Sequence, residues 1–412
     1  MSHWFGALAH ASPWNYAMDS TDTTVGFTFS SYGLIALIIG TILGDLVMSS
    51  RPPVPSLPSA SLDHRAQFAT MHFIGFRILL PIGVASWLAT FTPVAELPSA
   101  AAILSAGKQC LLLAICLLAW AEWQIGKLSR FVFWLGLTSL LPVVTVVSAG
   151  FIGYGIVMVT TVLAFTAMYF RPRWPLLLGL LAMLYGGVSL WVTYAEHRGE
   201  IRTSVWGGDQ TSIVLEKVFK VVQEFELFDI SNQDHLKNVD LRLNQNHLVG
   251  AAVRNTPSMV PFRNGETIYA AMLSIIPRAI WPDKPEVGGS GNYVSEHTLT
   301  SFAAGTSVGM GQVLEFYINF GTPCLIIGFV LLGAALRALD IRLAEALKAG
   351  QIQTVVLVFL TGSGLLQAGG SLNEVAASAA SGVVFSIGIS RLLSHIERRK
   401  NRQLSSLRAP IR

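Results

Sequence analysis

The reactive side chains of this sequence are concentrated between residues 242 and 317. They are Arg242, His247, Arg254, Arg263, Arg278, Asp283, Lys284, Glu286, Glu296, His297, Glu315 and Tyr317. Arginine offers a planar fork to phosphate oxygens and lysine a compact point charge. Carboxylates and imidazoles can take a proton from a hydroxyl group. The mixture is typical of a site that binds a phosphate and activates a hydroxyl nucleophile.

The sharpest motif in this region is IPRAIWPDKP, from Ile276 to Pro285. Its X-Pro steps and Trp281 predict a stiff, non-helical turn that follows an apolar helix. A stiff turn at a membrane surface that presents Arg278 and Lys284 could hold a lipid-linked phosphate. Alternatively, the two cations pair with Asp283 or Glu286, or reach lipid headgroups. Both interpretations remain open at this point.

Glu315 lies near the start of an apolar helix predicted to enter the membrane, and Asn319 follows on the same helical face. A carboxylate at such a depth is costly unless it is paired or faces water, so Glu315 is a candidate general base. The alternative is a structural partner for Arg278 or Lys284.

Three other charges fall inside predicted spans: Asp45, Arg77 and Lys108. Such groups usually face the interior of a helix bundle. Arg77 could bind an anionic headgroup, or it could neutralise Asp45. The long stem of Lys108 favours a structural role in which its charge reaches the interface.

These residues require a membrane scaffold to position them. Of the 412 residues, 52% are hydrophobic and only 13% charged, and the charges separate long apolar runs. About 20 apolar residues cross a bilayer. We predict an all-α, polytopic bundle of about nine spans: 27–49, 68–92, 97–120, 131–149, 151–170, 174–195, 311–337, 353–370 and 374–394.

The short connections predict the orientation. Arg51, Lys127, Arg130, Arg171 and Arg173 lie on one set of connections, together with the basic tail, whereas the opposite connections carry almost no Lys or Arg. By the positive-inside rule the C-terminus is cytoplasmic and the N-terminus lies outside. We therefore divide the chain into a six-span bundle (1–195), an outer loop (196–310), a three-span bundle (311–395) and a basic cytoplasmic tail (396–412).

The outer loop is predicted to be ordered. Val214, Val218, Val221, Phe225 and Phe228 recur at steps of three and four, which indicates an amphipathic helix. Two further helices are expected, from Leu241 to Asn255 and from Glu266 to Ile276. The last is too short to span, and we interpret it as interfacial or re-entrant.

Several function classes find no support in the sequence. It contains no GxxxxGK[ST] loop for nucleotide and no HExxH motif. The three cysteines lie in apolar runs, so they resemble buried hydrophobic residues rather than a disulfide framework. A formal net charge of +4 and the lack of a basic stripe argue against nucleic acid. We expect neither metal nor nucleotide as a cofactor.

The IPRAIWPDKP run, the Gly/Ser/Thr-rich stretch after it and the sequence GMGQVLEFYINFG together resemble the Wzy-type O-antigen and exopolysaccharide polymerases. The matching positions are Pro277, Arg278, Trp281, Pro282, Lys284 and Pro285, then Gly311, Glu315, Tyr317, Asn319, Phe320 and Gly321. The specific match covers about 50 residues, and the remainder agrees in topology and hydropathy.

The resemblance implies a glycosyltransferase of the bacterial inner membrane with a GT-C-like helical fold. It would move the growing glycan from undecaprenyl diphosphate to the next lipid-linked repeat unit at the periplasmic face. The lipid diphosphate carries the activation, so no cofactor is implied. Its partners would be the lipid-linked oligosaccharide, membrane lipids and a possible chain-length regulator.

The implied chemistry assigns roles. Arg278 and Lys284 would stabilise the leaving diphosphate, with Arg254, Arg263 and Arg77 in support. Glu315, or else His297, would be the general base. Trp281 and Tyr317 would stack on sugar rings.

Rival interpretations are a transporter or flippase for a lipid-linked or anionic substrate, a non-catalytic assembly subunit, and a related glycan ligase.

Overall fold

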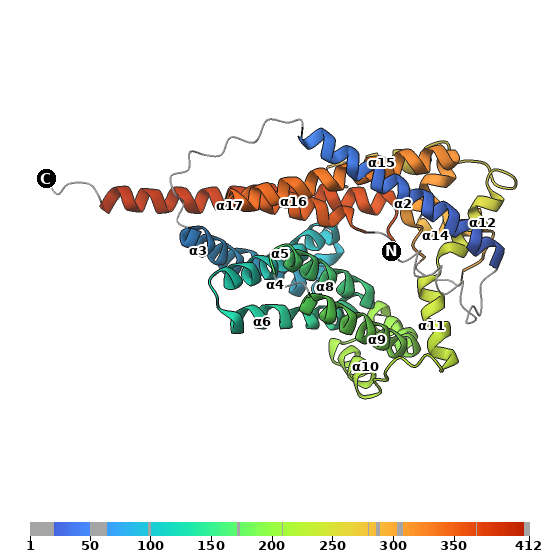
Figure 1. Ribbon diagram of the computed structural model, residues 1–412, viewed down its shortest axis with the longest axis horizontal. Helices are drawn as coiled ribbons and strands as arrows, with labels where there is room; N and C mark the ends of the chain where they lie inside the picture. Colours follow the sequence, from blue (N-terminus) through green and yellow to red (C-terminus); the bar gives the residue numbers. More distant parts are fainter. Residues whose placement is uncertain are drawn as a thin grey trace. The chain divides into compact units, whose positions relative to one another are not determined.

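The computed structural model describes residues 20–49, 64–97, 100–170, 174–207, 209–278, 280–285, 289–302, 308–367 and 369–407. All the elements in these ranges are helical, as predicted (Figure 1). The predicted outer position of the N-terminus concerns residues 1–19, and several charges used for the orientation or the turn, Arg51, Arg171, Arg173 and Glu286, also lie outside the described residues.

The helices follow one another in a simple order. In this order they are α2 Ser20–Ser49, α3 His64–Ile74, η1 Gly75–Leu79, α4 Leu80–Ala89, η2 Pro93–Glu96, α5 Ala100–Gln124, α6 Leu128–Leu137, η3 Thr138–Leu140, α7 Leu141–Ala149, α8 Ile152–Ala167, α9 Trp174–Gly207, α10 Thr211–Gln223, α11 Gln233–Leu243, α12 Asn246–Asn255, α13 Glu266–Ser274, α14 Ser290–Thr298, α15 Gly311–Lys348, α16 Ile352–Leu365 and α17 Leu372–Leu407.

These helices group into two compact units. Unit 1 comprises Met1–Ser30, Asp63–Val84 and Leu111–Arg254, and unit 2 comprises Ser31–Leu62, Ala85–Cys110 and Asn255–Arg412. Both units are discontinuous in sequence. The division into four parts that was made from hydropathy follows the expected membrane crossings, not these compact units. It stays a prediction.

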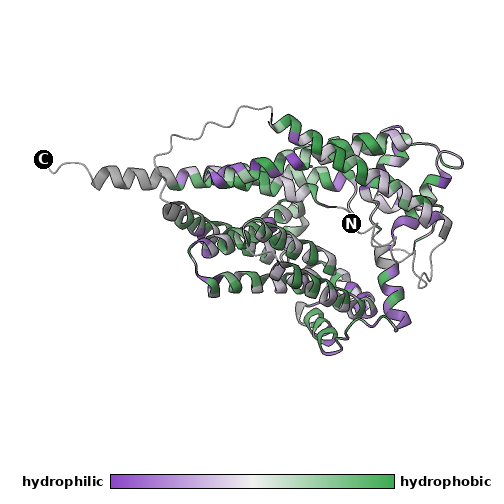
Figure 2. Ribbon diagram, in the orientation of Figure 1, coloured by the Kyte–Doolittle hydropathy of each residue, from purple (hydrophilic) through white to green (hydrophobic). Residues whose placement is uncertain are grey.

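In the part of the chain that the structure describes, seven helices are long and apolar enough to cross a membrane. Figure 2 colours these helices by the hydropathy of their residues. They cover Thr21–Ser49, Phe68–Ala89, Ala102–Gln124, Leu128–Ala149, Leu177–Gly207, Gly311–Lys348 and Leu372–Ile396. Two shorter apolar helices, Ile152–Ala167 and Ile352–Leu365, occupy the remaining predicted spans. The membrane character agrees with the prediction, and the count of nine spans stays a prediction because these two helices fall short of the crossing length.

Three prolines account for irregularities in the long helices. A proline has no N–H to donate to the carbonyl four residues earlier, and its ring clashes with that turn. Pro81 follows the π-helical turn η1, and Pro142 follows the 3₁₀ turn η3. Pro323 lies just after the break in α15, where Phe320 and Gly321 leave helical geometry.

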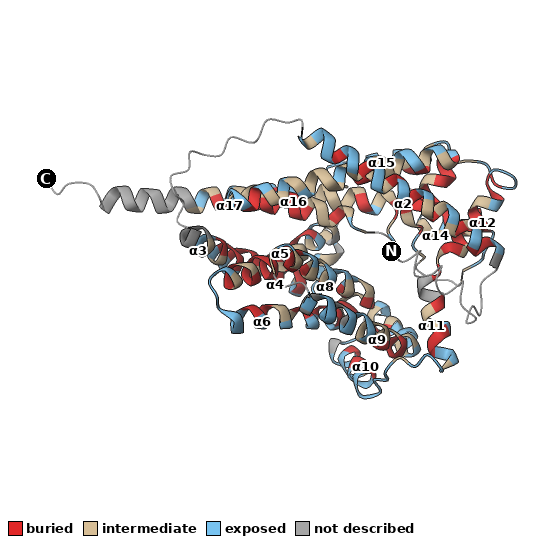
Figure 3. Cartoon of the chain, in the orientation of Figure 1, coloured by how far each residue is buried: buried red, intermediate tan, exposed pale blue. Residues whose placement is uncertain are grey.

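The core of unit 1 is built around α5, whose residues from Leu111 onward are largely buried (Figure 3). Leu113, Ala114 and Cys116 have no exposed surface. Near the end of this helix Glu122 is 2% exposed and lies 3.1 Å from Nε2 of His72. Arg130 approaches the same carboxylate at 3.6 Å. A buried carboxylate is thus neutralised inside the unit.

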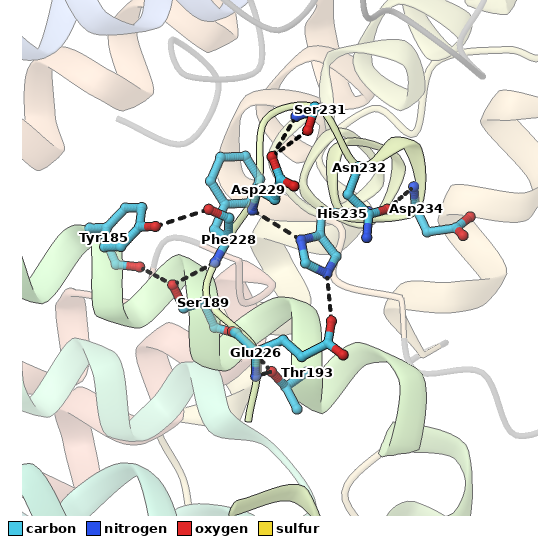
Figure 4. A network of polar contacts seen from close by, with 10 residues as sticks. All are labelled: Tyr185, Ser189, Thr193, Glu226, Phe228, Asp229, Ser231, Asn232, Asp234 and His235. Atoms are coloured by element: carbon cyan, nitrogen blue, oxygen red, sulfur yellow. Dashed lines mark hydrogen bonds and ion pairs between the residues drawn. The ribbon is translucent and has the colours of Figure 1, made fainter. Parts of the chain in front are cut away.

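In unit 1 the segment 224–232, which connects α10 to α11, is hydrogen-bonded to α9 (Figure 4). The backbone N–H groups of Glu226 and Phe228 donate to the hydroxyls of Thr193 and Ser189, at 3.2 and 3.0 Å. Buried His235 accepts from the Asp229 N–H at 3.1 Å. Extended backbone that would otherwise lack partners is satisfied in this way.

Also in unit 1, the start of α2 crosses α12 at very close range. A Cβ atom built on Gly250 would lie 1.8 Å from the carbonyl oxygen of Asp22, and one on Gly26 equally close to that of Asn246. Only glycine permits such an approach of two backbones. Arg254 then pairs with Asp22 at 2.8 Å.

Unit 2 is formed mainly by α13, α15, α16 and α17, which pack on one another. Within this unit Asp45 pairs with Arg337 at 2.8 Å, so the alternative in which Asp45 is neutralised by Arg77 is corrected. Lys108 has its ammonium 4.6 Å from the ring centre of Trp87. This cation–π contact supports a structural role for Lys108.

The outer-loop helices agree in part with the sequence pattern. The amphipathic helix is α10, although it ends at Gln223, before Phe225 and Phe228. The predicted helix from Leu241 to Asn255 is wrong in its start, because α11 ends at Leu243 and α12 begins at Asn246. α13 matches the third prediction. The short helix α14 lies in the Gly/Ser/Thr-rich stretch, where no separate helix was predicted.

Candidate functional site

The break in α15 positions the candidate site in unit 2. Because Pro323 cannot donate to the Asn319 carbonyl and the helix departs at Phe320, two carbonyls of α15 are freed. The Ile318 carbonyl accepts from the Arg263 N–H at 2.9 Å, and that of Asn319 accepts from the Asn264 N–H at 3.2 Å. The segment before α13 is thereby fixed against the apolar helix that leads into the membrane.

Arg263 is held by a buried histidine. Its Nε–H donates to Nε2 of His297 at 3.0 Å, and the other ring nitrogen lies 2.8 Å from the Thr256 hydroxyl. Since Nε2 accepts, the proton of neutral His297 resides on Nδ1. The His297 side chain has no exposed surface. Burial, followed by the neighbouring Arg263 charge, lowers the pKa of His297, which favours the neutral ring.

Two carboxylates complete the shell around Arg263. Its guanidinium pairs with Glu296, and with Glu266 at 3.4 Å. Both carboxylate side chains are 52% exposed, whereas that of Arg263 is 20% exposed. The Tyr293 hydroxyl donates to Glu266 at 2.9 Å. Burial and the bond to Glu266 raise the pKa of Tyr293 to about 12. These groups form an acidic cluster organised by one arginine.

Glu315 joins two helices of unit 2. Its Oε2 accepts the Leu372 N–H at 2.6 Å, at the start of α17, where unpaired N–H groups favour a negative charge. The Thr267 side chain donates to the same carboxylate. Asn319 then donates to the Thr267 hydroxyl at 2.8 Å and to the Glu315 carbonyl at 2.7 Å. Glu315 is 1% exposed, so direct contact with a substrate would require this network to open.

The IPRAIWPDKP turn is closed by its own cations. Nη1 of Arg278 donates to the carbonyls of Pro282 and Lys284, at 3.3 and 3.0 Å. Nζ of Lys284 donates to the carbonyls of Leu273 and Ile276, at 3.4 and 3.1 Å, where α13 ends. Burial and the adjacent Arg278 charge lower the pKa of Lys284. These bonds fix both charges with neutral acceptors.

The remaining predicted site residues are dispersed. Trp281, in the turn, is 38% exposed. Tyr317 is 8% exposed and donates to the Thr256 carbonyl at 3.3 Å, so its ring lies in the core. The prediction that it stacks on a sugar ring stays a prediction. Arg254 and Arg77 belong to unit 1, where Arg254 pairs with Asp22 and Arg77 lies exposed on η1.

The structure thus brings Arg263, His297 and the carboxylates together, and Arg278 with Lys284. Glu296 was among the reactive side chains of the sequence but was given no role, and Glu266 was not singled out. Glu296 and His297 are consecutive residues of α14, which lies in a Gly/Ser-rich stretch. The adjacent Glu296 and His297 were the sequence signal that could have indicated this part of the site.

Comparison with known proteins identifies a family whose function is not known. The family described as "Domain of unknown function (DUF8712)" matches residues 69–397. The chain belongs to this family. Neither the curated proteins nor the solved structures contain a match.

The turn and the acidic cluster offer side chains of different chemistry. The turn supplies two fixed cations, and the acidic cluster supplies two half-exposed carboxylates that can accept protons. Among the described residues, no group of three or more His, Cys, Asp or Glu side chains could hold a metal ion.

Proposed function

We propose that this chain is a membrane-embedded glycan polymerase. It transfers the growing oligosaccharide from undecaprenyl diphosphate to a hydroxyl of the next lipid-linked repeat unit, on the non-cytoplasmic face of the bacterial inner membrane. The turn at 276–285 resembles the corresponding run of Wzy-type polymerases, and a family of unknown function covers most of the chain.

The observation that best supports this proposal is the set of hydrogen bonds made by Arg278 and Lys284. The described bonds of both cations go to neutral carbonyl oxygens, which position the charges without cancelling them. A leaving diphosphate gains negative charge as its bond to the sugar breaks, and fixed cations favour that state over the ground state. The turn follows α13, whose apolar surface includes exposed Tyr269 and Met272, as suits a site for a lipid carrier.

The acidic cluster supplies the base in this proposal. Glu296 or Glu266 takes the proton of the acceptor hydroxyl, and the oxygen forms a bond to the anomeric carbon of the donor sugar. The bond from that carbon to the diphosphate oxygen breaks, and its electron pair leaves with undecaprenyl diphosphate. Arg263 orients both carboxylates, and half-exposed carboxylates can be reached by a hydroxyl without rearrangement.

His297 and Glu315, the two bases predicted from the sequence, have positioning roles in this proposal. Neutral His297 keeps Arg263 in place through Nε2, and Glu315 joins α15 to α17. General-base catalysis by either residue stays a prediction, and it requires that the buried carboxylate or ring exchange a protein partner for the substrate.

The experiment uses purified protein in nanodiscs with a lipid-diphosphate-linked oligosaccharide and no nucleotide. The wild type should produce a ladder of longer lipid-linked glycans. Arg278→Ala should lose it while eluting as the same monodisperse species. Arg342→Ala, which removes another exposed arginine of unit 2 from α15, is the matched control and should keep the ladder. Polymerisation by Arg278→Ala at the wild-type rate would contradict the assignment.

A transporter or flippase is the second candidate, and one observation favours it. Glu122 is buried among membrane-spanning helices with His72 and Arg130 as partners, an arrangement typical of ion or substrate pathways. This candidate predicts that Glu122→Gln abolishes movement of substrate across the bilayer. It also predicts that Arg278→Ala leaves that movement intact.

A further inference from the structure

A cavity of about 590 Å³ lies between α16 and α17 in unit 2. The two helices run side by side in red and orange in Figure 1 and pack closely. The cavity is lined by Gln353, Thr354, Leu357, Ser386, Ile387, Ser390, Arg391, Ser394 and His395. Its volume falls in the range of small-molecule sites.

The cavity lies at the end of these helices remote from the candidate site. Glu315 contacts the first residue of α17, whereas Arg391 and His395 come about five and six turns later. Gln353 and Thr354 are at the start of α16, directly after the loop that follows α15. The site for the proposed chemistry and this cavity are therefore separate.

The residues that line the cavity change from apolar to polar along its length, as a lipid changes from acyl chain to headgroup. Leu357 and Ile387 line it nearer the middle of the two helices, and both side chains are exposed. Ile387 lies eight residues, or about 12 Å, before His395 on α17. Nearer the helix ends, the outer part of the lining carries Arg391, His395, Ser390, Ser394 and Gln353, whereas the hydroxyl of Ser386 lies beside Ile387. The candidate span ends at Ile396, so the charged end of the cavity coincides with the expected boundary of the hydrocarbon.

The outer part is built to receive an anion. None of the described lining residues is acidic. Gln353 donates to Ser394 at 3.2 Å, which links the two helices at the cavity. The Arg391 side chain is exposed, and arginine forks match phosphate oxygens in pairs. Basic pockets between transmembrane helices are recognised by lipid headgroups.

We propose that this cavity binds the headgroup phosphate of an anionic glycerophospholipid of the surrounding bilayer. Arg391 binds the phosphate oxygens, with His395 and the hydroxyls of Ser390 and Ser394 as further donors. An acyl chain follows Leu357 and Ile387 toward the bilayer centre. The site holds α16 against α17 and does not depend on the proposed polymerase activity.

The test is native mass spectrometry of the purified full chain titrated with phosphatidylglycerol or phosphatidylcholine. The wild type should bind phosphatidylglycerol in preference. Arg391→Ala should bind it about tenfold more weakly, with phosphatidylcholine unaffected. Arg391→Lys keeps the charge but loses the fork, so its affinity for phosphatidylglycerol should be intermediate. Retained binding by this variant shows that the loss in Arg391→Ala does not come from misfolding. Arg342→Ala, an arginine outside the cavity, should behave as the wild type.

Three results would overturn the proposal. The first is equal binding of both lipids by the wild type. The second is indistinguishable phosphatidylglycerol binding by Arg391→Ala and Arg342→Ala. The third is displacement of the lipid by inorganic phosphate at equal concentration, because a site for free phosphate gains nothing from the acyl chain.

Discussion

Replacing Glu315 by Gln removes the charge at the start of α17 while keeping the volume of the side chain. In the native chain Oε2 accepts the Leu372 N–H at 2.6 Å, and Thr267 donates to the same carboxylate. A hydrogen bond to a charged group contributes about 1.5–3 kcal/mol, and a charge at a helix N-terminus about 0.3–1 kcal/mol. Gln retains an acceptor oxygen, so we expect a loss of about 1–2 kcal/mol.

Glu315→Ala should cost more. It removes both hydrogen bonds and leaves a void at a side chain that is 1% exposed. The expected loss is about 3–5 kcal/mol. One kcal/mol shifts the Tm of a domain of 150–250 residues by about 2–4 °C. For Glu315→Gln a decrease of a few degrees is therefore expected, and for Glu315→Ala a decrease several times larger.

The assay is thermal unfolding in detergent, followed by the monodisperse fraction on size-exclusion chromatography. Glu216→Gln, a change on an exposed face of α10, serves as the control and should leave the Tm unchanged. Polymer formation measured below the Tm separates the two roles of Glu315. If Glu315→Gln keeps the wild-type Tm but loses all activity, Glu315 is a base and not a helix cap, and the account of its position is refuted.

Three further outcomes are expected. The lowered pKa of His297 means that below its ordinary value of 6.5 the unfolded chain takes up a proton that the folded chain resists. The Tm should therefore fall as the pH decreases from 7 to 5, with a smaller slope in His297→Gln; equal slopes would contradict the neutral ring. Gly250→Ala places a Cβ atom 1.8 Å from the Asp22 carbonyl and should destabilise the chain by about 1–3 kcal/mol or more, whereas Gly199→Ala, in open space within α9, should not. Glu296→Gln should reduce the rate of polymerisation by about 10²–10⁴-fold at unchanged substrate affinity; a weaker affinity at an unchanged rate would assign Glu296 to binding alone.

The membrane scaffold was largely predictable because lipid imposes one constraint on the whole chain. Apolar runs of sufficient length must become helices, and the breaks at Pro81, Pro142 and Pro323 follow from their missing N–H groups. The limit was α14, where Gly, Ser and Thr outweigh helix formers locally. Burial of Tyr293, Val294 and His297 on one face stabilises this helix through tertiary packing.

The sequence predicted these members of the candidate site: Arg263, Arg278, Lys284, His297 and Glu315. It missed Glu266, and it did not predict the contacts of these side chains. Arg278 and Lys284 share a turn, as expected, yet their partners are carbonyls, whose availability depends on where α13 ends. Sequence spacing predicted that Glu315 and Asn319 share a helical face. It could not reveal that Leu372 meets Glu315, because 57 residues separate them and only the packing of α15 with α17 brings them together.

The central claim is that each turnover releases undecaprenyl diphosphate as one repeat unit is added. The most direct measurement is mass spectrometry of lipids and glycans after purified wild-type protein is incubated with a single lipid-linked repeat unit. The account predicts products that differ by whole repeat units, with one undecaprenyl diphosphate released per linkage formed. Recovery of the intact substrate, whether bound or moved to the opposite leaflet, would contradict it.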